Sequence, residues 1–202
     1  MLNQNIMLTK AEKTKQFILE TAAPLYNEKG ISGVSIDDVL EATKLTKGCI
    51  YGHFNGKDDL SEQVIDYSLN KMSVKMSAIV SQGRTAKEKV FLYLDFYKNP
   101  IDTFIAGGCP IFNTAVEADD NFPIIKKKVA ATLRAGQQGI ANVLQEGINN
   151  LEFSEKLNPE SFAFKMMAAV EGGIILCRTM ETSKPMIELV KSLKNELELY
   201  SL

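Results

Sequence analysis

Apolar residues recur along this chain at the three- and four-residue spacing of amphipathic helices, and the alternation typical of strands does not appear. Thr9 and Glu12 have the spacing of a capping box, which predicts that the first helix begins there. Its predicted end is Lys29–Gly30, because glycine tolerates the left-handed backbone that closes a helix. Pro24 lies inside this segment and should kink it. These patterns predict an all-α protein.

Capping residues, glycines and prolines divide the rest of the chain into further helices, giving about nine in all. Ser35 and Thr46 cap two short helices, and Gly56 precedes a long one that should run to about Val80. Thr85 opens the next helix with a second capping box. Helices are also expected near residues 112–118, over 123–149 and 159–182, and from residue 185 onward.

The two short helices and the turn between them carry the most informative residues of the chain. Two short helices joined by a tight turn form the scaffold that places a helix in the DNA major groove. The second of them carries Lys47, Tyr51 and His53 around Gly48, which has no side chain. These residues suit a phosphate-lined groove better than a protein core. The sequence therefore predicts a helix-turn-helix unit.

Three short sequence segments lie before and within this unit. They are Ile18-Leu-Glu-Thr-Ala-Ala, Ser35-Ile-Asp-Asp-Val and Thr46-Lys-Gly-x-Ile-Tyr-x-His-Phe-x-x-Lys-x-x-Leu60. Through them, residues 14–60 closely resemble the DNA-binding domain of the TetR family of bacterial transcriptional regulators. Farther along, Gly108-Cys-Pro-Ile-Phe-Asn113 is similar to a segment found in one branch of that family. The resemblance implies a DNA-binding domain over residues 8–55 and a larger effector-binding and dimerisation domain over residues 56–202.

The resemblance also implies a function, that of a homodimeric repressor whose partner is a double-stranded, palindromic operator. A small-molecule effector bound in the larger domain would change the separation of the two recognition helices and release the DNA. The last two helices of each subunit would form the dimer interface, where small residues such as Gly172 and Gly173 allow close approach. No cofactor and no metal is implied.

Seven residues in and beside the two short helices are expected to contact DNA. Lys47 and Tyr51 would reach phosphates or base edges, and Gly48 would let the helix approach the duplex closely. Ser35 and Thr46 would both cap a helix and lie near a phosphate. The full set is Ser35, Thr46, Lys47, Gly48, Tyr51, His53 and Lys57.

The effector pocket is expected among apolar and aromatic residues of the larger domain, with one acid as a polar anchor. Taken singly, each aromatic or methionine residue fits the hydrophobic core better than a pocket, and Cys109 fits plain packing better than a redox-sensing role. The expected lining residues are Phe96, Phe104, Cys109, Phe112, Glu117 and Met166.

Two positions depart from the family pattern, since Lys44 stands in the turn where glycine is usual and Leu40 where a small alanine is common. A side chain at Lys44 would strain the turn or change its geometry. This departure is the support for one alternative function, a helical interaction protein that has lost specific DNA binding. A second alternative, a cysteine hydrolase built on Cys109, lacks a histidine partner because His53 lies inside the DNA motif.

Composition narrows the picture further. A net charge of −2 means that any DNA contact is confined to a local basic surface. Three widely separated cysteines predict a reducing, cytoplasmic environment without a disulfide framework. The polar N-terminus predicts no secretory signal. The most apolar stretch, residues 162–177, is too short for a membrane span and is interrupted by Lys165 and Glu171.

Overall fold

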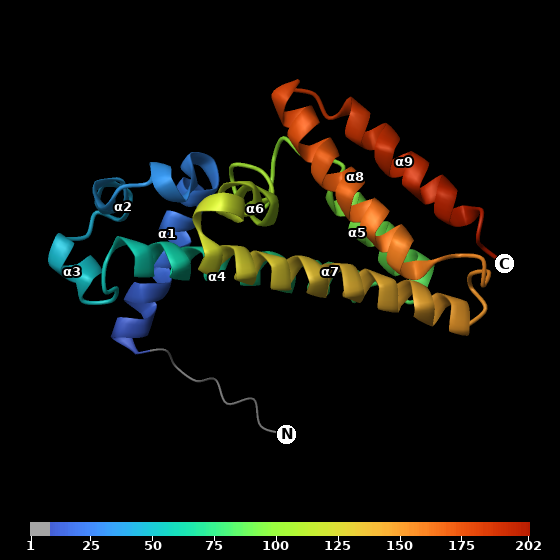
Figure 1. Cartoon of the computed structure of the whole chain (residues 1–202), viewed down its shortest axis with the longest axis horizontal. Helices are drawn as coiled ribbons and strands as arrows, with labels where there is room; N and C mark the ends of the chain where they lie inside the picture. The colour runs from blue at the N-terminus through green and yellow to red at the C-terminus, as the bar shows by residue number, and fades with distance from the viewer. Residues whose placement is uncertain (1–8) are drawn as a thin grey trace.

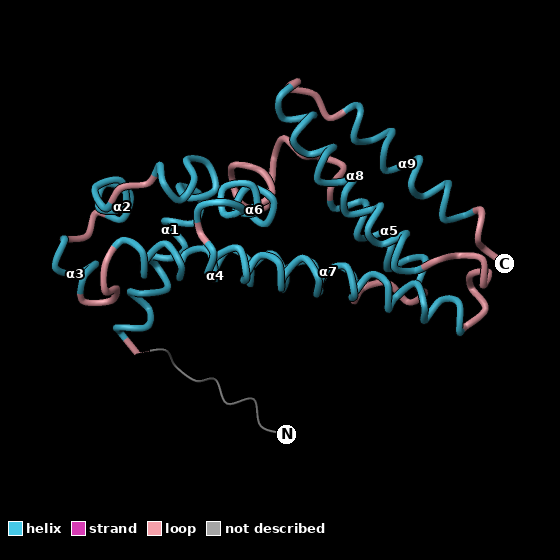
Figure 2. Tube along the Cα trace, viewed as in Figure 1, coloured by secondary structure: helices cyan, strands magenta, loops and turns pink. Residues whose placement is uncertain are grey.

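The computed structural model describes residues 9–202, which form nine α-helices and, in place of any strand, a single β-bridge between Phe153 and Ser201 (Figure 2). The prediction of an all-α fold with about nine helices is confirmed. Residues 1–8 lie outside the described residues; they include the first residue of the expected DNA-binding domain and part of the polar N-terminal segment.

The helices follow the predicted order closely. The first four are α1 (Lys10–Gly33), α2 (Ile36–Thr43), α3 (Lys47–Tyr51) and α4 (Lys57–Val80). The other five are α5 (Ala86–Phe96), α6 (Pro110–Asn121), α7 (Pro123–Asn149), α8 (Pro159–Thr179) and α9 (Lys184–Glu198). The helix α6 is longer than predicted on both sides. Its earlier start is at Pro110, because proline suits the first helical position.

Side-chain caps define the beginnings of several helices. Thr9, Ser35 and Thr85 each accept a hydrogen bond from the amide three residues on, and the acid at that position binds back to the cap. These are complete capping boxes, so two backbone donors are satisfied at each helix start. Thr46 begins α3 in the simpler way, since its hydroxyl accepts from the Cys49 amide at 3.3 Å.

The first helix is broken at Gly30, where the backbone leaves the helical conformation. Gly30 has φ 78° and ψ 171°, whereas Pro24 is not among the residues of α1 with non-helical angles. The expected kink at Pro24 stays a prediction, since the fixed φ of proline is compatible with helical angles even where the lost hydrogen bond bends the helix. The expected stop at Gly30 corresponds to this break, beyond which the chain makes one further turn to Gly33.

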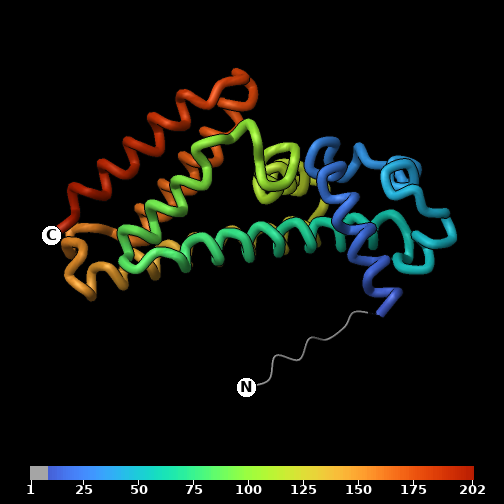
Figure 3. Tube along the Cα trace, turned by 180° about the vertical axis from the view of Figure 1, so that it is seen from behind, coloured from blue at the N-terminus to red at the C-terminus, as the bar shows by residue number. Residues whose placement is uncertain are grey.

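The helices α4 and α7 run side by side along the length of the molecule (Figures 1 and 3). At one end, α1, α2 and α3 gather around the start of α4. At the other end, α8 and α9 form an antiparallel pair, and α5 packs against α4, α7 and α9. The short α6 lies between the two ends and contacts α1, α4 and α7. The long helix α4 therefore connects both ends of the molecule.

Three clusters of buried side chains hold these helices together. The N-terminal core draws on α1 to α4 and includes Leu60 and Val64, so its packing extends past residue 55, the expected end of the DNA-binding domain. The C-terminal core joins α5, α7, α8 and α9. A small third core joins the end of α1 to α4, α6 and α7, and consists of Ile31, Ile65, Leu69, Ala118, Ile125 and Val129.

The turn between α2 and α3 keeps its geometry although lysine replaces the usual glycine. Lys44 has φ 58° and ψ 23°, and its amide donates to the Leu40 carbonyl at 2.9 Å. A left-handed conformation costs an L-residue about 1–2 kcal/mol. The turn therefore holds a strained residue within the helix-turn-helix.

We predict that Lys44→Gly raises the free energy of unfolding by about 0.5–1 kcal/mol, because relief of the left-handed strain exceeds the entropy cost of glycine. Denaturant unfolding followed by circular dichroism measures the change. The matched control is Lys44→Ala, which removes the charge and keeps the strain, so its stability should not rise. Equal stability of the glycine and alanine variants would show that the turn is unstrained.

Candidate functional site

The helix α3 lies at the end of the molecule far from α8 and α9 (Figure 1). Ile50 anchors it in the N-terminal core, where its side chain is fully buried. The opposite face is exposed and carries Thr46, Lys47, Gly48 and Tyr51. No heavy atom lies within 4 Å of the place where a Cβ on Gly48 would stand, so the backbone there is open to a large partner.

Tyr51 and Lys47 form the prominent part of this surface. The Tyr51 side chain is 46 % exposed, and the Lys47 ammonium lies 5.9 Å from the centre of its ring. His53 is half-buried just beyond the helix, with its ring edge-on to Phe54. A positive charge next to a phenol with a free hydroxyl is chemically suited to phosphates and base edges.

Ser35 and Lys57 lie at the starts of the neighbouring helices. The Ser35 hydroxyl donates to Asp38 at 2.5 Å, and Lys57 donates to the Ser32 carbonyl at 3.4 Å. Asp38 is also paired with Lys29 at 2.5 Å, and this hydrogen bond, followed by those from Ser35, lowers the pKa of Asp38. The charge of Asp38 is therefore balanced by Lys29.

The basic side chains facing outward are not neutralised in the same way. Within residues 9–202, no carboxylate forms a salt bridge with Lys44, Lys47 or Lys57. Their charge is therefore available to an anionic partner, as expected of a local basic surface on an acidic chain.

A cavity of about 500 Å³ opens between α4, α5, α7 and α8. Its wall is mainly apolar, and the ionisable side chains that line it include Lys89 and Glu171. Apolar lining residues from the four helices include Met76, Val90, Tyr93, Leu133, Val143 and Met167.

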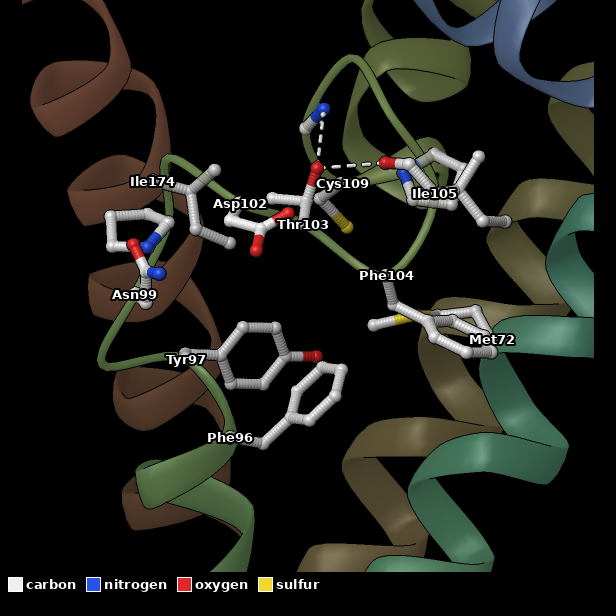
Figure 4. Close-up of a pocket in the computed structure, with 13 residues that line it drawn as sticks. Met72, Phe96, Tyr97, Asn99, Asp102, Thr103, Phe104, Ile105, Cys109 and Ile174 are labelled. Carbon is white, nitrogen blue, oxygen red and sulfur yellow. Dashed lines mark hydrogen bonds between the residues drawn. The ribbon is translucent and has the colours of Figure 1, made fainter. Parts of the chain in front are cut away.

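A second cavity of about 270 Å³ adjoins the loop between α5 and α6 (Figure 4). Three expected pocket residues line it, namely Phe96, Phe104 and Cys109. Figure 4 shows Phe96 on the side opposite Cys109 and Thr103. The Thr103 hydroxyl shapes the loop, since it donates to the Ile105 carbonyl at 2.7 Å and accepts from an amide at 3.2 Å. Met72 and Tyr97 line both cavities and so separate them.

The other three expected pocket residues line neither of these two cavities. Met166 is fully buried in the C-terminal core and Phe112 packs against that core. A step of about 100° per helical residue turns Met167, not Met166, toward the larger cavity. Glu117 faces α1 instead, and it lines only a recess of about 20 Å³ there.

Sequence reasoning missed Glu171 as a lining residue, although it interrupts the most apolar stretch of the chain. Its Oε1 accepts from the Cys109 thiol at 3.1 Å, while its Oε2 is buried and has no hydrogen-bond partner among the described residues. Burial raises the pKa of Glu171. Burial, and then the charge of Glu171, raise the pKa of the Cys109 thiol well above its usual value. Burial and the neighbouring acid therefore favour the protonated form of the Cys109 thiol.

Asn27 joins α1 to the loop that precedes α6. Its amide group donates to the carbonyls of Ala106 at 2.7 Å and Gly108 at 3.1 Å. In return, the Asn113 amide on α6 donates to the Asn27 carbonyl at 3.1 Å and to its side-chain oxygen at 2.9 Å. The N-terminal helix is thereby tied to the wall of the second cavity.

Glu117 makes the second connection between α6 and α1. Its carboxylate accepts from the amides of Ile31 at 2.6 Å and Ser32 at 2.8 Å, the two residues that follow the break at Gly30. A Cβ on Gly30 would lie 2.6 Å from Glu117 Oε2. The break thus supplies both the free amides and the space that the carboxylate needs.

Comparison with known proteins identifies the family. Residues 86–193 match the family described as "Tetracyclin repressor-like, C-terminal domain", a match over more than half of the chain. Residues 18–64 match the family described as "Bacterial regulatory proteins, tetR family". The chain belongs to the TetR family. It is therefore a TetR-family transcriptional regulator, and the resemblance of its helix-turn-helix to that family is confirmed.

Relatives cover nearly the whole of this TetR-family chain. A TetR-family regulator from Cytophaga hutchinsonii is 33 % identical, with 97 % of this chain and 98 % of that chain covered and a TM-score of 0.90. A TetR regulator from Chloroflexus aurantiacus is 29 % identical, with 96 % and 98 % covered and a TM-score of 0.91. The transcriptional repressor DhaR of a Mycobacterium species is 20 % identical over 172 residues, which are 85 % of this chain and 86 % of that protein.

Among residues 9–202, no helix has both the length and the apolar character of a membrane span. The same residues contain no cluster of three or more metal-ligating His, Cys, Asp or Glu side chains.

We predict that Gly30→Ala destabilises the TetR-family fold by about 1–3 kcal/mol, because the added methyl is strained at positive φ and collides with Glu117. Denaturant unfolding measures the loss. Gly33→Ala is the matched control, since a Cβ at Gly33 meets its nearest atom at an ordinary 3.4 Å and should change stability little. Equal losses in the two variants would contradict a specific role for the contact between Gly30 and Glu117.

Proposed function

We propose that this chain is a ligand-responsive repressor that binds a palindromic operator as a homodimer in the cytoplasm and leaves it when a small-molecule effector binds. The observation that carries the DNA-binding part is the exposed face of α3, with Lys47, Gly48 and Tyr51 beside lysines that form no salt bridge within residues 9–202. A short helix with an open glycine and donors at its start is suited to the major groove.

The expected DNA contacts divide by chemistry. Thr46 and the first amides of α3 are suited to a phosphate, as are Lys44, Lys47 and Lys57. Tyr51 projects farther and is suited to a base edge or a phosphate. The strained but intact turn at Lys44 supports this function over an interaction protein that has lost specific DNA binding, because it keeps α3 presented outward.

Two features support release by an effector. The larger cavity has the size and apolar wall of a small-molecule site. The loop that follows the cavity-lining α5 is fastened to α1 through Asn27, and α6 is fastened to it through Glu117. A ligand that moves α6 or this loop would also move α1, and with it the orientation of α3 on the DNA.

An apolar face on α8 and α9 supports the dimer. Phe164, Ile175, Leu176, Met180 and Ile187 are each at least 44 % exposed. Large apolar side chains left exposed on two packed helices suggest an interaction site. The occupant we propose is the same face of a second copy, which would give a four-helix interface related by two-fold symmetry and match a palindromic operator.

The test of the function is selection of duplexes from a random DNA library, followed by fluorescence anisotropy with the selected site. A palindromic consensus bound by two chains, with strong salt dependence, is expected. Enrichment of no sequence by the folded protein would favour the interaction protein instead.

We predict that Tyr51→Ala weakens operator binding by about 5–100-fold, since a specific contact contributes about 1–3 kcal/mol. Lys47→Ala should lower the magnitude of the slope of log K against log salt by about 0.9, one phosphate contact. The control is Phe17→Ala on α1, whose ring is 46 % exposed like that of Tyr51 and which should bind as the unmodified protein does. Unchanged affinity of both Tyr51→Ala and Lys47→Ala would exclude α3 as the recognition helix.

We predict that Leu176→Glu raises the dimer dissociation constant by about tenfold or more, because a charge would be buried in an apolar interface. Sedimentation velocity over a concentration series measures it. Val74→Glu on α4 is the matched control, since Val74 and Leu176 are both 59 % exposed. The interface assignment fails if both variants dissociate equally or neither does.

A further inference from the structure

The larger cavity contains one carboxylate whose hydrogen bonding is incomplete. Glu171 lies on α8 among apolar lining residues, and within residues 9–202 only its Oε1 has a partner, the thiol of Cys109. A thiol is a weak donor, so it satisfies a carboxylate poorly. Buried carboxylates in folded proteins are normally paired with a cation or with several strong donors.

The other charged group at this cavity does not supply the missing partner. Lys89 also lines the wall, but its ammonium binds Glu146 at 3.2 Å. Tyr93 and Tyr97 line the same cavity; burial and then the charge of Glu171 raise the pKa of Tyr93, and burial is the main cause of the raised pKa of Tyr97. The apolar space is thus bordered by an acid and by two electron-rich rings.

We propose that the cavity binds an apolar molecule that carries a single ammonium group, and that Glu171 holds this group. The inference rests on the proposed function, because it names the chemical class of the effector. A cation with N–H donors would satisfy Oε2 through charge-assisted hydrogen bonds. An anionic ligand would meet a buried carboxylate without compensation and is selected against.

Glu171 needs only a small movement to bind such a group. In the structure, Glu171 Oε2 is buried in the wall of the cavity, away from solvent. The terminal torsion of a glutamate is soft, so a rotation of the carboxylate turns this oxygen into the cavity. An ammonium group also favours the ionised form of the acid and so opposes the effect of burial.

The same carboxylate is connected to the DNA-binding end. The rotation that turns Oε2 toward an ammonium group would move Oε1 away from the Cys109 thiol, and Cys109 is the residue directly before α6. The preceding Gly108 donates its amide to Thr103, and its carbonyl accepts from Asn27 on α1. Loss of the contact between Cys109 and Glu171 would therefore remove one of the contacts that position this loop against α1.

The experiment uses three probes with one carbon skeleton, phenylbutylamine, phenylbutanol and phenylbutyrate, titrated into the full-length protein without DNA by calorimetry. The amine should bind about tenfold more tightly than the alcohol, the value of one charge-assisted hydrogen bond. The carboxylate should bind most weakly. Equal binding of amine and alcohol, tighter binding of the carboxylate, or no binding of the amine at millimolar concentration overturns the proposal.

Variants then locate the site. Glu171→Gln should abolish the preference for amine over alcohol while the alcohol still binds. Glu160→Gln removes the same charge from an exposed position at the start of α8 and should keep the preference. A preference retained in Glu171→Gln overturns the assignment to Glu171. The comparison of amine with alcohol in the unmodified protein needs no variant, so it decides the ligand class even if Glu171→Gln does not fold.

Operator DNA separates this inference from the proposed function. If the amine binds through Glu171 and the operator complex persists, the ligand class stands and effector-driven release is wrong. If the alcohol releases the operator as well as the amine does at equal occupancy, release stands and the role of the ammonium group is wrong.

Discussion

The contact between the Glu117 carboxylate and the two amides beyond Gly30 governs how the DNA-binding end is held to the rest of the molecule. A helix that breaks inside a protein exposes amides that must find acceptors. Here the acceptor is a carboxylate on α6, a helix of the larger domain. The hydrogen bonds that satisfy the amides of α1 therefore also connect α1 to α6. Asn27, one turn earlier, makes a second polar connection. Its side-chain amide donates to carbonyls of the loop before α6.

The long helix α4 is the other element common to both ends, and its packing explains why the connection is not loose. Its first turns contribute Leu60 and Val64 to the N-terminal core, and Ile65 and Leu69 belong to the small core with α6 and α7. Successive turns of one rigid helix are thus buried in different cores. A displacement of α6 would act on α1 through polar contacts and on α4 through apolar ones, so both supports of α3 would respond together.

The sequence predicted the local features well because their causes are local. Capping boxes, prolines and glycines act within four residues, and the helices they predict are present. The DNA-contacting residues stay a prediction, although the structure exposes Lys47 and Tyr51 as that prediction requires. The effector pocket was harder, because which of two adjacent methionines faces a cavity depends on how α8 is rotated against α7. No pattern in the sequence states that rotation.

Glu117 and Glu171 show why an acid on an apolar helix was ambiguous. Glu171 interrupts the most apolar stretch of the chain, and Glu117 was the expected polar anchor of the pocket. In the structure, each carboxylate oxygen of Glu117 accepts a hydrogen bond from a backbone amide, so this carboxylate has a structural role. Glu171 receives a single weak donor and keeps one oxygen without a partner. The number and strength of the donors around each carboxylate, which only tertiary structure supplies, distinguish a structural acid from one left for a ligand.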